Sequence, residues 1–334
     1  MRFSVIVPVF RVEKYIEECL DSIRRQSFED FECIMVDDGS DDRCPEICDA
    51  FAARDTRFKV IHKANGGIVS ARKAGAEAAE GDYIVCVDGD DFVDAALLQT
   101  LHGIIQEHSP DSVIYGANRY TDHAEGSFYS NVPVGYYSGE ALETIFDTCL
   151  YDPAVKGIND GSILFYMWCK CVKRQHFVAC QRVVDESITN GEDVVFTLRW
   201  KSETHCACFT DYCGYFYRSN EGSLERSFKR DCLDKLDFLT GEMRRICPEF
   251  DDKINVFYFY RALKFCLLAA QQLGYGGYMR FVREHFRKER LLIIKSAQLK
   301  RHTAASFVKY QLVRNRMWRI LYLLANTWFA GKFG

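Results

Sequence analysis

The sequence contains no long hydrophobic run. The first apolar stretch, VIVPVF at residues 5–10, is short and interrupted by Pro8, and the longest one near the end, residues 320–325, is equally brief. A secretory signal peptide needs an apolar region of about 7–15 residues, and a membrane-spanning helix needs about 20. We therefore expect no signal peptide and no membrane-spanning helix. We expect the protein to remain in the cytosol.

A basic excess is also missing, because 43 Lys and Arg face 47 Asp and Glu and the net charge is -4. A general nucleic-acid binder usually carries an excess of cations over its whole domain. We therefore expect no nucleic-acid partner.

Acidic residues are absent from one segment, residues 290–334, which contain nine Lys or Arg. Within it, SFVKYQLVRNRMWRILYLLANTWFAGKF (residues 306–333) combines aromatic and aliphatic side chains with positive charge. This pattern is typical of a helix that lies on an anionic membrane, here the inner face of the plasma membrane. The alternative is a helix that packs on the rest of the protein or on a second copy, with a solvated basic edge.

The 15 cysteines lack the paired CxxC motifs of a zinc ribbon. Most are scattered through apolar segments, where a free cysteine behaves as a small hydrophobic residue. The nearest approach to a metal pattern is His205 with Cys206, Cys208 and Cys213, and we favour buried free thiols over a zinc site there.

Strands and helices alternate through residues 3–88. FSVIVPV (3–9), FECIMVDDGS (31–40), FKVIH (58–62) and DYIVCVD (82–88) begin as apolar runs typical of strands covered on both faces. Amphipathic or alanine-rich segments at residues 12–26, 45–55 and 68–80 separate them. The alternation predicts βαβ units, and hence an α/β fold with a mainly parallel sheet flanked by helices.

The later sequence is less regular. We predict a helix at 94–107, a strand at 112–120, a helix at 191–203 and a pair of strands within 205–218, whereas residues 120–161 show too little periodicity to assign. From residue 229 onward the pattern is mainly helical. This change predicts two domains, residues 1–228 and residues 229–334, the second a helical region that ends in the basic tail.

Polar residues follow three of the predicted strands. Asp37 and Asp38 end the second strand, Asn65 follows the third, and the acids of VCVDGDDFVD (residues 85–94) end the fourth. Parallel strands present their carboxyl ends at one edge, where ligands bind in open α/β sheets. We expect these side chains to converge there.

Asp88 and Asp90 offer two carboxylates to one hard divalent cation, with coordination positions left for phosphate oxygens. An isolated D-x-D motif can equally be a solvated acidic turn before a helix. An EF-hand loop is disfavoured, because Val93 stands where its glycine is required.

Two blocks place this cluster in a family. SVIVPVFRVEKYIEECLDSIRRQSFEDFECIMVDDGSDD (4–42) and NGGIVSARKAGAEAAEGDYIVCVDGDDFVD (65–94) resemble, in order and spacing, the family 2 glycosyltransferases, inverting sugar-nucleotide enzymes of the GT-A fold. MWCKCVKR, GEDVVF and YFYRSNEGSLERS match later blocks of bacterial members that build surface polysaccharides. The resemblance implies a nucleotide-sugar donor, a divalent metal and a glycan or lipid-linked glycan acceptor.

The resemblance also implies roles for the residues near the nucleotide. Asp38 would bind the uracil of a UDP-sugar, in a pocket lined by the backbone of Pro8 and Val9. Arg72 would lie near the nucleotide, although Lys73 stands where the family usually has asparagine, so the role of that position is open.

The resemblance also implies roles for the acidic turn, which comprises residues 88–91. Asp88, Gly89 and Asp90 would bind the donor, and Asp88 and Asp90 would hold Mn²⁺ or Mg²⁺. Asp91 would support the loop.

An inverting transfer needs one general base for the acceptor hydroxyl. The family's base is the aspartate of an E-D pair, here Glu192 and Asp193, which implies that Asp193 is the base. From the residues alone, both acids are equally suited to the N-terminus of a helix.

Four residues match the family blocks on the acceptor or phosphate side, and Glu192 is one of them. Arg218 and Ser223 would belong to a loop near the diphosphate or acceptor, and Trp168 would contact a sugar. Alternatively, Arg218 is a surface charge at a strand end and Trp168 belongs to the core.

The sequence thus predicts a metal-dependent hexosyl- or N-acetylhexosaminyltransferase. A sugar-nucleotidyltransferase is disfavoured, because VPVFRVEKY after the first strand contains no glycine for a triphosphate loop. A GT-A protein that binds nucleotide or glycan but has lost catalysis is the other alternative.

Overall fold

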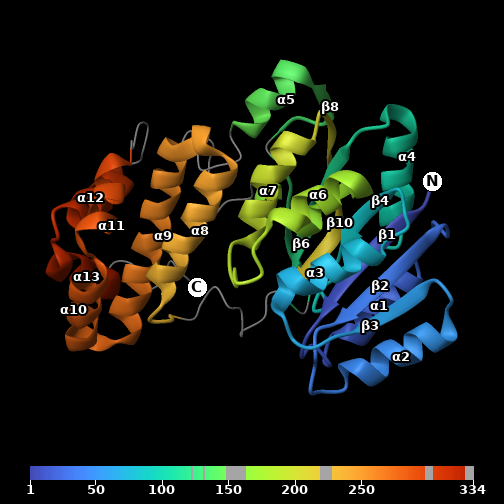
Figure 1. Cartoon of the computed structure of the whole chain (residues 1–334), viewed down its shortest axis with the longest axis horizontal. Helices are drawn as coiled ribbons and strands as arrows, with labels where there is room; N and C mark the ends of the chain where they lie inside the picture. Colours follow the sequence, from blue (N-terminus) through green and yellow to red (C-terminus); the bar gives the residue numbers. More distant parts are fainter. Residues whose placement is uncertain (122, 131, 148–162, 219–227, 298–303, 328–334) are drawn as a thin grey trace. The chain divides into compact units, whose positions relative to one another are not determined.

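The computed structural model describes the chain except residues 122, 131, 148–162, 219–227, 298–303 and 328–334. The described residues form two compact units (Figure 1), one running to Arg218 and the other starting at Phe228.

The first unit contains one sheet. Its strands are β1 (Phe3–Val9), β2 (Phe31–Asp37), β3 (Phe58–His62), β4 (Tyr83–Cys86), β5 (Phe92–Val93), β6 (Ser112–Tyr120), β7 (Ala124–Phe128), β8 (Gly135–Ser138), β9 (Lys170–Lys173) and β10 (Cys206–Arg218). The main path through the sheet is β3-β2-β1-β4-β9-β6-β10-β5. The pairs β2–β3, β1–β2, β1–β4 and β6–β10 are parallel, whereas β9 runs antiparallel between β4 and β6. The predicted α/β alternation is confirmed.

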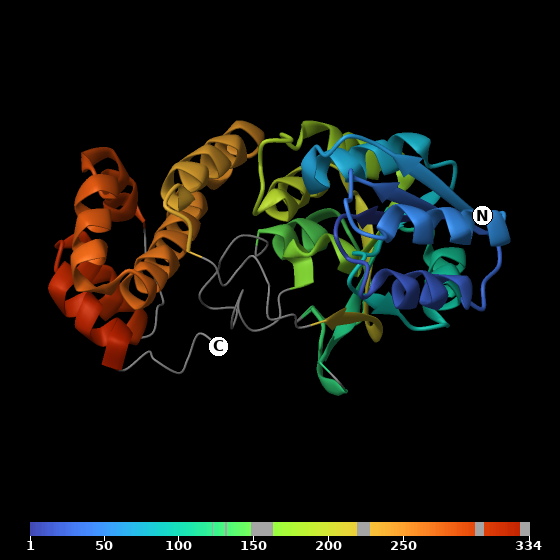
Figure 2. The same cartoon turned by 90° about the horizontal axis from the view of Figure 1, so that it is seen from below.

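Helices cover this sheet. They are α1 (Ile16–Arg24), α2 (Cys44–Arg54), α3 (Gly67–Ala78), α4 (Leu97–His108), α5 (Gly139–Phe146), α6 (Arg174–Val183) and α7 (Glu192–Glu203). In α1 the buried Ile16, Cys19, Leu20 and Ile23 recur at helical spacing. Helix α3 packs on β1 and β2 and against α6, which packs against α7. In Figure 2, the dark-blue α1 and the teal α4 lie below the sheet and the light-blue α3 lies above it.

One sequence expectation for this unit is wrong. Residues 205–218 do not form a pair of strands, because Cys206–Arg218 is a single strand that pairs with β6 in both halves. Its register shifts between Phe209 and Cys213 and again between Cys213 and Tyr215. An irregularity of this kind absorbs extra residues without a turn.

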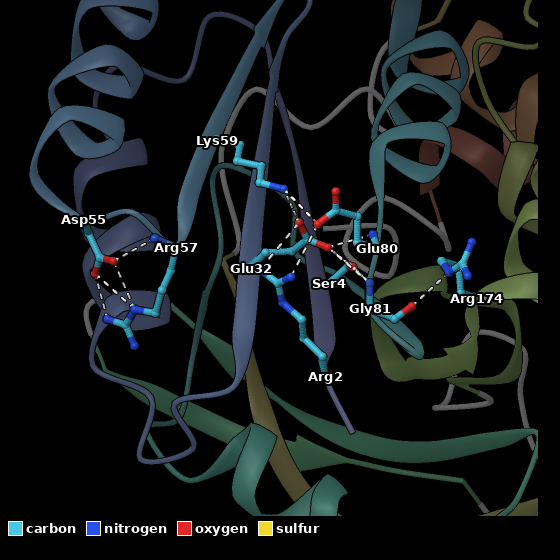
Figure 3. A network of polar contacts seen from close by, with 9 residues as sticks. All are labelled: Arg2, Ser4, Glu32, Asp55, Arg57, Lys59, Glu80, Gly81 and Arg174. Atoms are coloured by element: carbon cyan, nitrogen blue, oxygen red, sulfur yellow. Dashed lines mark hydrogen bonds and ion pairs between the residues drawn. The ribbon is translucent and has the colours of Figure 1, made fainter.

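A polar network joins strands at the edge opposite their carboxyl ends (Figure 3). Glu32 of β2 is fully buried; its Oε1 accepts from Ser4 Oγ at 2.7 Å and from the amide of Glu80 at 2.7 Å, and its Oε2 lies 2.9 Å from Lys59 Nζ. These hydrogen bonds keep the pKa of Glu32 below its ordinary value, although burial alone would raise it. The network connects β1, β2, β3 and the segment that precedes β4.

The second unit is helical: α8 (Cys232–Ile246), α9 (Asp251–Gln272), α10 (Gly274–His285), α11 (Lys288–Ser296), α12 (Ala304–Arg314) and α13 (Trp318–Thr327), drawn orange to red in Figure 1. Helix α9 is at its centre and contacts each of the other helices. Among the described residues, no helix combines the length and apolar character needed to cross a bilayer.

Candidate active site

Asp38 lies directly after β2 and organises the loop that begins α3. Its buried carboxylate accepts from Lys63 Nζ at 2.6 Å, from the Gly66 amide at 3.0 Å and from the Gly67 amide at 2.7 Å. Gly39 turns the chain with φ +71°, and a Cβ there would lie 2.8 Å from the Asn65 amide nitrogen. Asp38 and Asn65 therefore meet at this edge, as the sequence predicts. Lys63 was not predicted, because its only indication in the sequence is its place at the end of a strand.

The acidic turn after β4 approaches β1 closely. A Cβ added to Gly89 would lie 3.0 Å from the carbonyl oxygen of Pro8, so a side chain there would require the backbone to shift. The structure thus brings Pro8 and Gly89 together.

Asp91 connects the acidic turn to strand β10. It is buried, and its carboxylate accepts from the Tyr215 hydroxyl at 2.6 Å and from the Arg218 amide at 2.7 Å. Tyr215 Oη in turn accepts from the Asp88 amide at 3.2 Å. Burial, followed by the charges of Asp90 and Asp88, raises the pKa of Asp91 to about 8. The turn is therefore built from a strand that is distant in sequence.

Arg72 of α3 brings the turn and the E-D pair together. Its Nη2 donates to Asp88 Oδ1 at 3.1 Å, and its Nη1 donates to Asp193 Oδ1 at 2.9 Å and to Glu192 Oε1 at 3.3 Å. The guanidinium side chain is only 2% exposed, whereas Asp88 and Asp193 are 24% and 20% exposed. The two carboxylates therefore face solvent on one side and a buried cation on the other.

Asp193 and Glu192 form the first turn of α7. The second carboxylate oxygen of Asp193 accepts from the Met167 amide at 3.4 Å. Burial raises the pKa of Asp193, and Arg72 opposes the rise. Burial and the neighbouring Asp193 raise the pKa of Glu192 to about 7. Carboxylates with raised pKa values at a helix start are suited to accepting a proton near neutral pH.

Arg218 lies beside the acidic turn, at the end of β10. Its Nε donates to the Asp90 carbonyl at 2.9 Å and its Nη2 lies 2.7 Å from Glu18. Its guanidinium carbon is 5.0–5.3 Å from the ring centroids of three aromatic residues, Tyr15, Phe92 and Tyr120. Ser223 falls outside the described residues.

Trp168 is buried in an aromatic stack. Its ring lies 4.8 Å from Tyr166 and 4.6 Å from Tyr215, nearly parallel to both, and the residue is 3% exposed. Nearby, the fully buried Lys170 donates to the carbonyls of Leu164 and Tyr166, both at 2.7 Å. Lys170 therefore holds the segment that places the Met167 amide against Asp193, and no sequence pattern indicated that this lysine is internal.

Comparison with known proteins shows which family the chain belongs to. The family model described as Glycosyl transferase family 2 matches residues 4–149. The chain is 36% identical over 232 residues to EpsJ of Bacillus subtilis, described as an uncharacterized glycosyltransferase, covering 70% of this chain and 65% of EpsJ. It is 38% identical over 251 residues to the glycosyltransferase GlyG of Streptococcus pneumoniae, covering 69% of this chain and 77% of GlyG. The chain belongs to glycosyltransferase family 2.

The fold agrees with this assignment. A crystal structure of Staphylococcus aureus TarS, residues 1–349 with UDP-GlcNAc, matches 96% of this chain and 92% of that chain with a TM-score of 0.63 at 19% identity. A likeness at that identity concerns the fold alone. This family 2 glycosyltransferase therefore has the GT-A fold that the sequence predicts.

The acidic turn is chemically suited to a divalent cation. Among the described residues, no group of three His, Cys, Asp or Glu side chains is placed to hold a metal ion, either here or at Cys206. Two carboxylates, Asp88 and Asp90, still supply hard oxygen donors on a partly exposed turn. The pKa of Asp91 is raised in part by their negative charges, and a bound cation would offset those charges. The oxygen donors of this turn therefore fit a hard divalent cation.

Proposed function

We propose that the protein transfers a sugar from a UDP-sugar to a hydroxyl of a glycan or lipid-linked glycan, with inversion and with a divalent metal, in the synthesis of a surface polysaccharide. The observation that carries the proposal is the pairing of Asp88 and Asp193 on one buried guanidinium. It brings a donor-side carboxylate and a base beside one another, each with an open face.

In the proposed reaction, Asp193 accepts the proton of the acceptor hydroxyl as that oxygen bonds to the anomeric carbon of the donor. The bond between that carbon and the diphosphate oxygen breaks on the opposite side, and UDP leaves with the electron pair. Without a general base, the hydroxyl proton would have to pass to water. Asp193 accepts it instead, as the new bond forms.

The donor is held by residues at the same edge of the sheet. Asp38 and the backbone of Pro8 and Val9 bind the uracil ring. Asp88, Gly89 and Asp90 face the ribose and the diphosphate. Asp88 and Asp90 would hold Mn²⁺ or Mg²⁺, which supplies Lewis-acid neutralisation of the leaving diphosphate. Glu192, Arg218 and Ser223 belong to the acceptor or phosphate side in this proposal, whereas Trp168 is 3% exposed and belongs to the core.

A donor panel tests this function. The purified protein is incubated with UDP-GlcNAc, UDP-glucose, UDP-galactose, GDP-mannose and a dTDP-sugar with Mn²⁺, and the released nucleoside diphosphate is measured. We expect release from one UDP-sugar that stops when EDTA is added. UDP-GlcNAc has priority because a TarS structure of the same fold contains it. Silence across the panel, with no thermal shift from any nucleotide, would instead favour a GT-A protein without catalysis.

We propose further that residues 1–228 are catalytic and that residues 229–334 dock the protein on the cytoplasmic face of the plasma membrane. Helix α13 and the residues before it expose Met317, Ile320 and Leu323, which are 42%, 42% and 61% exposed. Arg316 and Arg319 are exposed beside them, and no acid occurs from residue 290 onward. Apolar side chains among cations suit the surface of an anionic bilayer.

Substituting Ile320→Asp and Leu323→Asp together is expected to weaken binding to phosphatidylglycerol vesicles at least about tenfold. Each buried aliphatic side chain is worth about 1.5–3 kcal/mol, and the added charges are repelled by the lipid. Co-sedimentation measures the effect, with phosphatidylcholine vesicles as the uncharged reference. Val134→Asp is the matched control, since Val134 is 63% exposed and lies in the first unit, outside the proposed docking region; we expect it to bind vesicles as the wild type does. Equal binding by the double variant and the wild type would contradict the membrane proposal.

A further inference from the structure

The burial of Arg72 is at odds with a nucleotide-binding role. The whole residue is 1% exposed, so it presents almost no surface to a phosphate or a base. Both terminal nitrogens of its guanidinium donate to carboxylates, and no described residue accepts from its buried Nε. A buried charge is tolerated only when it is paired, and here three carboxylates provide the pairing.

We infer that Arg72 is a positioning residue that fixes the carboxylate of the base, Asp193, relative to the donor-side carboxylate of Asp88. The inference rests on the proposed function, in which Asp193 is the base. It differs from the role near the nucleotide that the family resemblance implies for Arg72.

The geometry favours arginine for this task. A guanidinium is a rigid planar fork whose two terminal nitrogens keep a fixed separation. One of these nitrogens is committed to Asp88 at 3.1 Å and the other to Asp193 at 2.9 Å. The spacing of the two carboxylates is therefore set by a covalent frame. A lysine ammonium is a single flexible point charge and cannot impose that spacing.

The three elements that carry these groups come together only through the fold. Arg72 lies in α3, Asp88 follows β4, and Asp193 opens α7, while α3 and α7 both pack against α6. The other oxygen of Asp193 meets the Met167 amide at 3.4 Å. Without Arg72, the carboxylates of Asp88, Glu192 and Asp193 would face one another with their shared cation removed, and mutual repulsion would turn Asp193 away from the acceptor.

The experiment compares Arg72→Met and Arg72→Lys with the wild type. Turnover is followed as UDP release from the UDP-sugar that the panel selects, and UDP binding in Mn²⁺ is measured by calorimetry. We expect Arg72→Met to lower kcat by about 10²-fold, the scale of a catalytic group misplaced by about 1 Å. Arg72→Lys restores only part of kcat. The Kd for UDP changes by less than about threefold in both, whereas loss of a true phosphate ligand would cost about tenfold or more.

A matched control separates this effect from the loss of an ion pair in general. Arg57 pairs with Asp55 at 2.7 Å in the same unit, just before β3 and therefore at the edge of the sheet opposite the carboxyl ends of the strands; Figure 3 shows the pair. Arg57→Met is expected to keep kcat within about twofold, because sites without shared partners act independently. Should Arg72→Met fail to fold, circular dichroism identifies that failure and the decision passes to Arg72→Lys.

A double-variant cycle decides between positioning and an independent role. In the Asp193→Asn background, Arg72→Lys is expected to lower kcat by less than about twofold further, because there is no base left to position. The inference would be overturned if the kcat losses of the two single variants multiplied in full in the double variant. A UDP Kd weakened about tenfold by Arg72→Lys would also overturn it. A normal kcat for Asp193→Asn would instead overturn the proposed base, so the two failures are distinguishable.

Discussion

Asp193→Asn is expected to reduce turnover by about 10²–10⁴-fold, the usual contribution of a general base. Asparagine has nearly the same shape, and its amide oxygen can still accept from Arg72 or from the Met167 amide, which lie 2.9 Å and 3.4 Å from the aspartate oxygens. It cannot accept the proton of an acceptor hydroxyl. The Kd for UDP is expected to stay near the wild-type value, since the substitution removes the base and leaves the donor site intact. Steady-state UDP release and calorimetry measure the two quantities separately.

Glu192→Gln is the matched control, because Glu192 is the adjacent acid and shares Arg72 Nη1 at the longer distance of 3.3 Å. We expect it to retain at least about a tenth of the wild-type kcat, since removing a neighbouring charge perturbs the base without removing it. A rate near the wild-type level for Asp193→Asn, or the larger loss in Glu192→Gln, would contradict the assignment of the base.

The pH profile provides a second test of Asp193. Burial raises its pKa, as does Asp88, while Arg72 and the internal Lys170 lower it. Glu192, beside it, has a pKa raised to about 7. A base must be ionised to act, so kcat/KM is expected to fall as the pH decreases through the raised pKa of Asp193 and to recover above it. Asp193→Asn should flatten this acidic limb. An identical limb in the variant would show that another group titrates.

The α/β architecture could be predicted from sequence because three of the early strands, β1, β2 and β4, are buried along their whole length. The burial of β1 and β2 extends over every residue, so their sequences are mainly apolar, with Ser4, Glu32 and Asp37 as buried polar exceptions. The helices between them keep the spacing of a buried stripe. Strand β10 was harder, because its irregular register puts Asp211 and Gly214 inside one strand, where they read as a turn.

The edge of the sheet was predictable for residues that follow strands and less so for their partners. Asp38 and Asp88 could be placed together from topology alone. Arg72 is far from Glu192 in sequence, and nothing in the spacing indicates that the two share a hydrogen bond. Lys170 presents the related difficulty of a residue type that is usually exposed, and only the converging carbonyls of Leu164 and Tyr166 make its burial possible.

Asp90→Asn is expected to reduce turnover by at least about 10²-fold, because a Lewis-acid metal is worth several kcal/mol of charge stabilisation and each 1.4 kcal/mol is about tenfold. The substitution exchanges an anionic oxygen donor for a neutral amide. The backbone carbonyl of residue 90 can still accept from Arg218 Nε at 2.9 Å, and Asp91 still receives the Tyr215 hydroxyl at 2.6 Å. The turn therefore keeps its shape and loses one negative charge.

The readout that isolates the metal is the effect of Mn²⁺ on UDP binding, measured by calorimetry with and without EDTA. In the wild type we expect Mn²⁺ to tighten UDP binding, because the cation joins two anionic partners, the acidic turn and the diphosphate. In Asp90→Asn that increase should largely disappear. Asp82→Asn is the control, since Asp82 is an exposed acid at the other end of β4 that accepts from the Arg2 amide at 2.9 Å. An unchanged Mn²⁺ effect in Asp90→Asn would place the metal on other ligands, whereas its loss in Asp82→Asn as well would indicate that Mn²⁺ responds to the general negative charge of the unit.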